Sequence, residues 1–461
     1  MEYALLKVHI PNRARESPPK RGSIKMSKGT DLWNKAKRII PGGNQLLSKR
    51  AEMFLPDQWP AYYQKAKGAR IWDLDGNEFI DMSIMGIGTS VLGYANDQVN
   101  AAVIRAVENS VVSTLNCPEE VELTEKLLAL HPWADMARYS RTGGEACTIA
   151  VRIGRAFSGK SKVAFCGYHG WHDWYLASNL ADGNNLDGML LPGLEPKGVP
   201  SQLRGSSLPF EYGNSAAFLA LVEANRNELG VIIMEFAKQK KVDLDFIKLV
   251  QKTAREIGAV LIIDEVSSGF RLNIGGMHML YGIEPDIVVL GKALGNGYAI
   301  SAVLGKRDVM NAAQSTFISS TYWTERSGFV AALETIKFFE KHNVIEAIKN
   351  TGGILRSELE KIFQKHDLDI ELLGLPTIIV MAIRGDDALE IKTCFTQEML
   401  KRGFLASNVI FVSYAHTEDL VKDYLKNADE VFSLIRELKA KGSLKSSLNG
   451  PVCHSGFKRL N

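Results

Sequence analysis

The amino-acid sequence predicts an α/β protein built around a mainly parallel sheet, and three segments lead to this prediction. Residues 231–235 form an apolar run of strand length that ends at Glu235. Residues 244–257 place Phe246, Val250 and Ile257 at helical spacing, and a second strand-like run begins at residue 260. A strand, a helix and a strand in this order form a βαβ unit, whose strands are parallel and whose crossover is right-handed.

Length and composition set the broad class. A chain of 461 residues exceeds the size of a single hydrophobic core, so we expect two or more core regions. An apolar fraction of 46% and a charged fraction of 23% are ordinary for a folded protein and exclude disorder of the whole chain. The formal charge of +3 is small for this length, so the sequence predicts neither nucleic-acid binding nor a membrane partner.

Cysteine usage and hydropathy indicate the compartment. The five cysteines are scattered and include no CxxC pair, which predicts reduced thiols and no metal site. No apolar run reaches the roughly 18 residues of a membrane span, and the N-terminal region lacks the apolar core of a signal peptide. We therefore expect a cytoplasmic protein.

The two ends of the chain differ from its middle. Residues 1–28 are rich in proline and basic residues, which predicts a flexible extension of undefined role, with Met26 as an alternative natural start. The tail over residues 442–461 is rich in Ser, Gly and Lys and is also predicted to be flexible. Residues 69–79 predict two short strands joined by a turn at Asp75-Gly76. A smaller α+β region made from both chain ends is therefore expected beside the central sheet.

Two apolar runs are followed closely by side chains that can take part in catalysis, a carboxylate and an amine. The run over residues 261–266 contains Asp264, and the run over residues 287–290 is followed by Lys292, 28 residues after Asp264. Strands of this kind deliver their last side chains to a common site. A carboxylate and an amine placed together suit pyridoxal phosphate (PLP), whose ring nitrogen needs a carboxylate and whose aldehyde needs a lysine. The alternative is a buried Asp–Lys ion pair, and these residues alone leave both interpretations open.

A glycine pair marks a candidate phosphate site. Residues 141–145 read Arg-Thr-Gly-Gly-Glu and precede a helical stretch over about residues 146–157. Glycines at a helix start let a phosphate approach free backbone N–H groups, where the helix dipole favours its negative charge. The alternative is an ordinary turn, because Gly-Gly is common at such junctions.

A second phosphate-type motif lies nearby. Residues 154–161 fit the pattern GxxxxGK[ST] of a P-loop, with Lys160 and Ser161 in the nucleotide-binding positions. A P-loop leaves a strand and opens a helix, whereas this segment leaves a helix and precedes the strand-like residues 162–165. The context predicts a helix-ending turn.

Aromatic and histidine residues follow that predicted strand. Tyr168 stands just past the strand end, where an aromatic ring can stack on a planar cofactor, and His169 can shape the same pocket. His169 and His172 also have the HxxH spacing of a metal site. No third ligand accompanies them in the sequence, so cofactor-pocket roles for Tyr168 and His169 are favoured over zinc.

Together these motifs resemble the class III PLP-dependent aminotransferases, and most closely their glutamate-1-semialdehyde 2,1-aminomutase branch. The branch is indicated by the opening segments, residues 40–43 and 67–81, and by the closing motif at residues 413–417. The resemblance covers about residues 29–440. The family motifs occur in the order 142–146 (TGGEA), 168–170 (YHG), 264–266 (DEV), Gly291-Lys292 and Ser320-Thr321.

The resemblance implies an architecture. It implies PLP fold type I, with a large domain around a mainly parallel seven-stranded sheet and a small α+β domain from both chain ends. It also implies a homodimer with shared active sites. The expected parts are a flexible extension at 1–28, the N-terminal part of the small domain with dimer contacts at 29–95, the large PLP-binding domain at 96–335, the C-terminal part of the small domain at 336–441, and the tail at 442–461.

The same resemblance implies roles for individual residues. Lys292 would form the Schiff base with PLP and carry protons, and Asp264 would bind the pyridine N–H and keep the ring an electron sink. Tyr168 would stack on one face of the ring, with His169 in the same pocket. The other implied cofactor contacts are Val266 on the opposite ring face, Gly143 and Gly144 at the phosphate with Thr142 close by, and Thr321 at the phosphate of the neighbouring subunit. Glu145 and Glu235 match acidic family positions near the site.

Three departures from the branch bear on the substrate. After Pro-Gly-Gly the branch carries a serine and an arginine that holds a carboxylate, but Leu46 and Lys49 stand at these positions here. A one-residue slip restores Ser48 and Arg50 only in part, so bidentate carboxylate recognition is not assured. The run over residues 406–412 also lacks the glutamate with which the aminomutase retains its intermediate, which favours an ordinary aminotransferase that releases its keto product.

The third departure follows Thr321. Where the family has small residues, this chain carries Tyr322, Trp323 and Arg326, which either line a different substrate pocket or pack at a dimer interface. Lys49, Arg50, Glu145, Trp323 and Arg326 are the candidate substrate residues.

The sequence therefore favours a PLP-dependent aminotransferase that moves an amino group between an amine donor and a small carbonyl acceptor, either a keto acid, a semialdehyde or a keto sugar. One alternative is glutamate-1-semialdehyde 2,1-aminomutase, an isomerase of tetrapyrrole synthesis. A remote alternative is a P-loop nucleotide-binding protein that uses Lys160.

Overall fold

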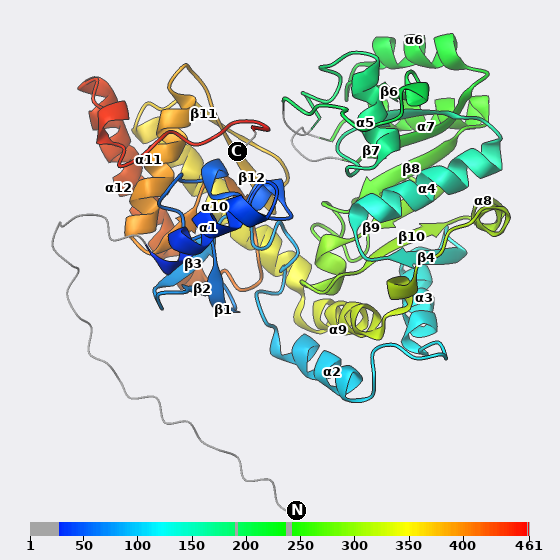
Figure 1. Cartoon of the computed structure of the whole chain (residues 1–461), viewed down its shortest axis with the longest axis horizontal. Coiled ribbons are helices and arrows are strands. Elements are labelled where there is room, and N and C mark those ends of the chain that lie inside the picture. Colours follow the sequence, from blue (N-terminus) through cyan, green and yellow to red (C-terminus); the bar gives the residue numbers. More distant parts are fainter. Residues whose placement is uncertain (1–26, 190–191, 237–241, 459, 461) are drawn as a thin grey trace, which may run out of the picture.

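The computed structural model describes residues 27–189, 192–236, 242–458 and 460. The predicted extension at residues 1–28, Met26 included, thus lies almost wholly outside the described residues. Figure 1 shows two lobes, a large one formed by the middle of the chain and a small one formed by both chain ends.

The large lobe contains a seven-stranded sheet with the strand order β4-β10-β9-β8-β7-β5-β6. In the described sheet, β10 runs antiparallel to both of its neighbours, β4 and β9, and the other pairs are parallel. This confirms the prediction of a mainly parallel seven-stranded sheet. The strands are β4 Met136–Ser140, β5 Lys162–Cys166, β6 Ser207–Pro209, β7 Leu229–Glu235, β8 Val260–Glu265, β9 Ile287–Leu290 and β10 Ser301–Gly305.

The predicted βαβ unit is present as β7, α7 (Leu244–Ile257) and β8. The Asp243 side chain caps the helix by accepting a hydrogen bond from the backbone N–H of Phe246. The helix ends at Gly258, whose φ of 68° is the left-handed conformation that glycine adopts without strain. Polar caps at both ends therefore fix the length of this crossover.

Helices cover both faces of the large sheet. Val231 and Ile233 of β7 pack toward helix α4 (Gly143–Ser158). The alternate residues Ile232 and Met234 pack toward α7 on the other face, together with helix α6 (Ser215–Asn225). Burial on both faces explains why these strands are continuous apolar runs in the sequence.

The small lobe is built jointly from the two ends of the chain. In its four-stranded sheet, β13 from the C-terminal part runs parallel to β3 from the N-terminal part, with Phe404 opposite Ile80. The turn predicted at Gly76 joins β2 to β3. The strands are β1 Tyr63–Lys67, β2 Arg70–Asp73, β3 Glu78–Met82 and β13 Phe404–Ala406 in this sheet, and β11 Ile370–Leu373, β12 Ile378–Ile383 and β14 Val409–Phe411 in a second, three-stranded sheet.

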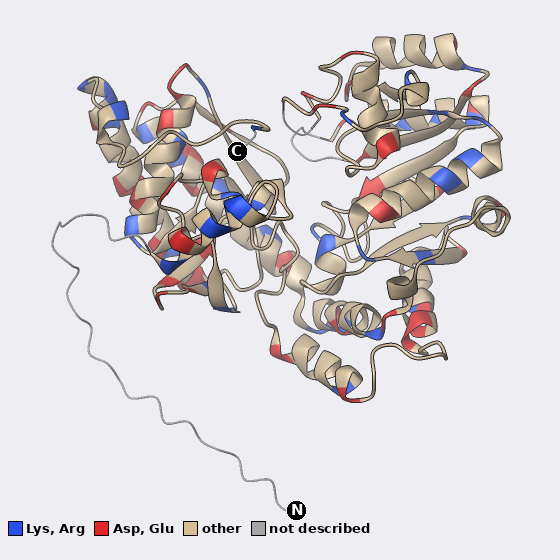
Figure 2. Ribbon diagram, viewed as in Figure 1, with Lys and Arg blue, Asp and Glu red and all other residues tan. Residues whose placement is uncertain are grey.

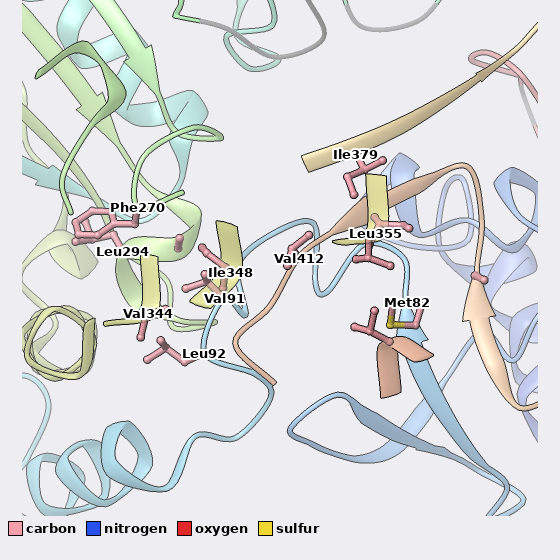
Figure 3. Packing of buried hydrophobic residues seen from close by; sticks show 14 of the residues in the cluster. Met82, Val91, Leu92, Phe270, Leu294, Val344, Ile348, Leu355, Ile379 and Val412 are labelled. Atoms are coloured by element: carbon pink, nitrogen blue, oxygen red, sulfur yellow. The ribbon is translucent and has the colours of Figure 1, made fainter. Parts of the chain in front are cut away.

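One hydrophobic cluster joins the two lobes. Phe270 and Leu294 of the large lobe pack in the same cluster as Ile348, Leu355 and Ile379 of the small lobe (Figure 3). The lobes therefore share a core, which fixes the site residues of one lobe relative to the other. The remaining helices are α1 Lys28–Ile39, α2 Asp97–Glu108, α3 Glu119–Leu130, α5 Asp173–Leu176, α8 Arg307–Met310, α9 Arg326–His342, α10 Val344–Lys365, α11 Ala388–Lys401 and α12 Glu418–Ala440.

A buried arginine reinforces the junction between the lobes. Arg271 donates hydrogen bonds from Nη1 to the Val412 carbonyl at 2.9 Å and from Nη2 to the Gly88 carbonyl. Burial lowers the pKa of this guanidinium to about 10, so it stays charged at neutral pH. The loop that follows β8 is thereby tied to both chain segments of the small lobe.

The C-terminal tail does not match the prediction of a flexible segment. It contains a short 3-10 helix, Lys445–Ser447, and Cys453 is only 3% exposed. The backbone N–H of Cys453 donates to Thr393 Oγ1 at 3.0 Å, and that of Asn449 donates to Gln397 Oε1 at 2.7 Å. Composition alone missed these contacts because a few separate hydrogen bonds and single apolar residues, such as Leu444 and Cys453, hold the tail rather than a long periodic apolar face.

Charged residues of both signs are interspersed over both lobes (Figure 2). Within the described part of the chain, no helix combines the length and the apolar character needed to cross a bilayer.

Candidate active site

Asp264 lies at the end of β8 and is 4% exposed. Its Oδ2 accepts hydrogen bonds from His169 Nδ1 at 2.7 Å and from Cys147 Sγ at 3.2 Å, and its Oδ1 accepts one from the Val266 backbone N–H at 2.9 Å. Burial opposes ionisation, but the hydrogen bonds and charge of His169, with those of Val266 and Cys147, outweigh it and lower the pKa of Asp264. The carboxylate is therefore anionic at neutral pH.

Lys292 lies just past β9, the neighbour of β8. Glu265 pairs with Leu290 across the two parallel strands, so Asp264 and Lys292 emerge at the same edge of the sheet. The Lys292 backbone has a φ of 40°, a left-handed conformation that is unusual for a residue with a side chain. Its Nζ donates a hydrogen bond to Ser267 Oγ at 2.5 Å. The Lys292 backbone is thus strained, and its amine is held by a hydrogen bond to Ser267.

The N-terminus of helix α4 lies against this edge. Its first two N–H groups, those of Gly143 and Gly144, have no acceptor within the helix. A Cβ at Gly143 would come within 2.8 Å of Val266 Cγ1, and a Cβ at Gly170 would come within 2.7 Å of the Gly144 Cα. The glycines therefore keep open a cradle of backbone donors that side chains would fill.

Thr142 and Glu145 form the cap of this helix. The Thr142 hydroxyl accepts from the Glu145 backbone N–H, and Glu145 Oε2 accepts in return from the backbone N–H of Thr142 at 2.9 Å. Such a capping box fixes the first turn of the helix. The backbone N–H groups proposed to bind a phosphate at residues 142–144 are thus held in fixed positions.

Tyr168 and His169 close another side of the site. Gly167 turns the chain with a φ of 112°, and the Tyr168 backbone N–H donates to Glu235 Oε2 at 3.2 Å. Burial, with the nearby acidic groups and Cys147, raises the pKa of the Tyr168 hydroxyl. The predicted residues Tyr168, His169 and Glu235 are thus brought together with Asp264.

The sulfur of Cys147 belongs to the same cluster. Ligand atoms of Cys147, His169 and Asp264 all lie within 4.8 Å of one another, close enough for a metal ion. Their mutual hydrogen bonds account for the arrangement without one, because His169 Nε2 also contacts the Cys166 carbonyl at 3.2 Å. His172, the other half of the HxxH spacing, stacks on Trp171 instead.

Some candidate substrate residues have protein partners. Trp323 donates from Nε1 to Glu145 Oε1 at 3.2 Å, and Glu145 in turn accepts from the Thr142 backbone N–H in the helix cap. Arg326 forms a bidentate pair with Glu119, with contacts of 2.9 and 2.6 Å, which occupies one edge of its guanidinium. These contacts favour a supporting role for Arg326 over substrate binding.

The other candidates lie at the surface or at the meeting of the lobes. Thr321 and Lys49 are exposed in the single chain. Arg50 donates from Nη1 to the Lys458 carbonyl at 2.9 Å and lies over the Phe457 ring at 5.6 Å. Arg50 is therefore held by the C-terminal tail.

The P-loop-like segment is a helix end. Gly159 caps α4 with a φ of 66°, and β5 follows immediately. The Lys160 amine donates to the carbonyls of Arg226 and Ile257 at 3.2 and 2.9 Å. This is the helix-ending turn that its context predicted.

Sequence reasoning missed three residues of the site. Arg141 donates to the carbonyls of Tyr322, Ala299 and Glu325 and thereby holds the segment that carries Thr321. Ser267 contacts Lys292, and Cys147 contacts Asp264. Ser267 stands three residues after Asp264, and the i, i+4 position of Cys147 from Gly143 marked the inner face of α4.

This fold and this arrangement define a PLP-dependent enzyme of fold type I, with PLP as its cofactor. Residues 55–414 match the family described as aminotransferase class-III, and the chain belongs to that family.

Three relatives show how far the similarity extends. The chain is 30% identical to 3-aminobutyryl-CoA aminotransferase of Cloacimonas acidaminovorans (strain Evry), over 86% of this chain and 94% of that protein. It is 31% identical to glutamate-1-semialdehyde 2,1-aminomutase of Methanococcoides burtonii, over 86% and 96%. The PLP-containing structure of the FumI protein of Sphingopyxis sp. MTA144 superposes with a TM-score of 0.81 at 26% identity, over 90% of this chain and 97% of that one.

Proposed function

We propose that this enzyme moves an amino group between an amine donor and a small carbonyl acceptor by using Lys292 and Asp264. The observation that carries the proposal is the convergence of an anionic Asp264, the strained Lys292 and the glycine cradle at one edge of the sheet. When bound, PLP supplies an electron sink for the substrate carbon next to the nitrogen. The chain's own residues then have three tasks.

The first task is to hold the cofactor ring. Asp264 would accept a hydrogen bond from the pyridine N–H, for which one acceptor position on Oδ1 remains. Val266 and Tyr168 would hold the ring from its two faces, and His169 Nδ1 orients the Asp264 carboxylate at 2.7 Å. A buried, oriented carboxylate keeps the ring nitrogen protonated.

The second task is to bind the phosphate. Gly143 and Gly144 present backbone N–H groups, and Thr142 stands beside them at the helix cap. We further propose a homodimer in which the exposed Thr321 reaches the phosphate in the partner's site. The exposed Phe317 and Tyr322 nearby, 84% and 69% exposed, fit burial by a second copy.

The third task is proton transfer. Lys292 would hold the cofactor through Nζ and, once free, would carry a proton at Nζ to and from the substrate carbon. Ser267 holds this nitrogen at 2.5 Å. Lys292, Asp264 and Tyr168 are thus the proposed catalytic residues.

The acceptor is proposed to be small, either a keto acid, a semialdehyde or a keto sugar. The name of the Cloacimonas relative describes an amino group on a chain whose carboxylate is a thioester. This supports substrates whose acid group is masked or absent, in agreement with the missing arginine at residue 49.

A second candidate is glutamate-1-semialdehyde 2,1-aminomutase, because the Methanococcoides relative of that name is 31% identical. It predicts formation of 5-aminolevulinate from the semialdehyde without an external amine donor. No product with saturating PLP would remove this candidate.

The experiment that tests the proposal is an amine panel against the purified PLP-loaded protein. We expect some amines to convert the visible absorption of bound PLP to that of pyridoxamine phosphate, and Lys292→Ala to abolish this conversion. A protein that never takes up PLP, or a panel with no conversion by any amine, would remove the proposal.

A further inference from the structure

The Glu145 carboxylate connects the phosphate cradle to the segment that carries Thr321. Its Oε2 accepts hydrogen bonds from the backbone N–H groups of Arg141 and Thr142 at 3.0 and 2.9 Å, and from the Thr142 hydroxyl at 3.2 Å. Its Oε1 accepts one hydrogen bond from the described residues, that of Trp323 Nε1 at 3.2 Å. The indole N–H is therefore what holds the second oxygen of this carboxylate.

The place of Glu145 in helix α4 makes the direction of its carboxylate important. Thr142 is the N-cap of the helix, and Glu145 is its third residue. A carboxylate at this position can reach back to the N-cap or bind N–H groups of the first turn, where the helix dipole attracts it. Here it binds the N–H of Thr142 rather than those of Gly143 and Gly144. A Glu145 side chain that turned onto the first turn would compete with a phosphate for the same donors.

The Trp323 ring is held by contacts that do not involve Glu145. It belongs to the short 3-10 helix Thr321–Thr324 and packs against the hydrophobic cluster that includes the inner face of α4. The Arg141 guanidinium donates to the carbonyls of Tyr322 and Glu325 and so fixes the backbone on both sides of the ring. The indole N–H thus reaches Glu145 from a segment that is already fixed.

Loss of this N–H should affect the phosphate end of the cofactor and not its ring. Without it, Oε1 would have no donor among the described residues, and the carboxylate would be free to approach the N–H groups of Gly143 and Gly144. Donors that are already in place and unblocked bind an anion without a further cost of ordering. The hydrogen bonds of Asp264, which would bind the ring, come from other residues.

We propose that Trp323 is a positioning residue for the cofactor phosphate. Through Nε1 it orients the Glu145 carboxylate toward the N-cap, and it thereby keeps the N–H groups of Gly143 and Gly144 open. Trp323 then acts on the cofactor site and not on the amine. This inference rests on the proposed role of the two glycines in binding the phosphate.

The experiment compares PLP with pyridoxal, which has the same ring and aldehyde but no phosphate. Each is titrated into the PLP-free protein and followed by visible absorbance. Trp323→Phe keeps an aromatic ring and removes the N–H, so we expect it to raise the Kd of PLP about five- to tenfold and that of pyridoxal less than about twofold. The control is Trp72→Phe in the small lobe, where the indole lies 4.8 Å from Lys65 Nζ. It should change neither Kd.

A double-mutant cycle tests whether Trp323 acts through Glu145. Glu145→Ala removes the carboxylate, so Trp323→Phe in that background should not raise the Kd of PLP further. Effects that multiply would mean that Trp323 acts by another route and would overturn the proposal. Inorganic phosphate, as a competitor of PLP uptake, reports on the cradle alone. Its inhibition constant should rise in Trp323→Phe by a factor similar to that of the PLP Kd, and an unchanged constant would also overturn the proposal.

The outcomes separate two failures. Equal weakening of PLP and pyridoxal binding in Trp323→Phe, or no weakening of either, would show that Trp323 does not position the phosphate. If the intact protein binds PLP no more tightly than pyridoxal, the proposed phosphate cradle fails and the role of Trp323 fails with it. If both Kd values change as expected but no amine is converted, the proposed amino-group transfer fails and the role of Trp323 stands.

Discussion

Asp264 and Glu265 are neighbours on β8 and point to opposite faces of the sheet, and each meets a histidine. His169 Nδ1 lies 2.7 Å from Asp264 Oδ2, and His278 Nδ1 lies 2.7 Å from Glu265 Oε1. Both carboxylates are buried, and hydrogen bonds lower the pKa of each against the opposing effect of burial. By sequence and by electrostatics the two acids look alike.

Their hydrogen bonds distinguish them. Glu265 accepts four: from the backbone N–H groups of Met277 and His278, from His278 Nδ1 and from Ser268 Oγ. A carboxylate has about four acceptor positions, so Glu265 is saturated by the protein. Asp264 accepts three from described residues and has one position left, on the face where the glycine cradle lies. A carboxylate that binds a ligand needs an open acceptor position, as Asp264 has. A carboxylate whose acceptor positions are all used by the protein, as in Glu265, can only stabilise the fold.

Replacement of Asp264 tests the open position and should give the largest effect. Asp264→Asn removes the negative charge and places an amide opposite the pyridine N–H. We expect kcat/KM to fall about a thousandfold for any amine that the intact enzyme converts. Steady-state kinetics measure this change, and a urea titration of both proteins checks the fold. A loss smaller than about tenfold would contradict the proposed role.

The companion change, Glu265→Gln, tests the saturated position. The amide cannot accept four hydrogen bonds, so donors such as His278 Nδ1 lose their partner in the interior. We expect the free energy of unfolding to fall by about 3–5 kcal/mol, while the folded protein keeps most of its kcat/KM. Urea unfolding followed by fluorescence measures the first transition. Unchanged unfolding together with an activity loss like that of Asp264→Asn would erase the distinction between the two acids.

Low pH should destabilise the fold around Glu265 through protonation of His131. The His131 ring stacks on His278, the partner of Glu265, with ring centroids 5.6 Å apart. Burial lowers the pKa of His131 from 6.5 to about 4, so the folded protein binds fewer protons than the unfolded chain between these values. The free energy of unfolding should therefore fall as the pH is lowered from about 6.5 to 4, by about 3 kcal/mol in total.

The measurement is urea unfolding at several pH values in the intact protein and in His131→Asn. The asparagine cannot titrate, and its amide can still donate to the Leu127 carbonyl that His131 Nδ1 contacts at 2.8 Å. The variant should show a shallower loss of stability in this pH range. Equal slopes in the two proteins would show that His131 is protonated in the fold.

The elements of the large sheet could be predicted from the sequence because the residues that determine them are close together in the chain. Continuous apolar runs, an Asp cap and a terminal glycine specify β7, α7 and β8 within 37 residues of chain, and Asp264 and Lys292 follow from where such runs end. The P-loop-like segment was also assigned correctly, since a helix before it and a strand after it are local facts.

Contacts between distant segments could not be predicted in this way. The pair of Arg326 with Glu119 joins residues 207 apart, and that of Arg50 with Lys458 joins residues 408 apart. No periodicity marks such partners, because a single hydrogen bond or ion pair leaves no repeating pattern. The same reason hides which of two adjacent acids keeps an open acceptor position, because the hydrogen-bond partners of Asp264 and Glu265 come from other segments of the chain.

The smallest expected effect concerns Cys147, the third partner of Asp264. Burial, with the nearby charge of Asp264, raises the pKa of this thiol, so it remains protonated and can donate to the carboxylate. Cys147→Ala removes one donor and leaves His169 and Val266, so we expect PLP affinity to weaken about three- to tenfold. Cys147→Ser keeps a donor and should recover most of the affinity. Titration of the PLP-free protein with PLP, followed by visible absorbance, measures both. Equal weakening in the two variants would mean that Cys147 acts through its volume. Its hydrogen bond to Asp264 would then contribute nothing to PLP affinity, and only those from His169 and Val266 would count.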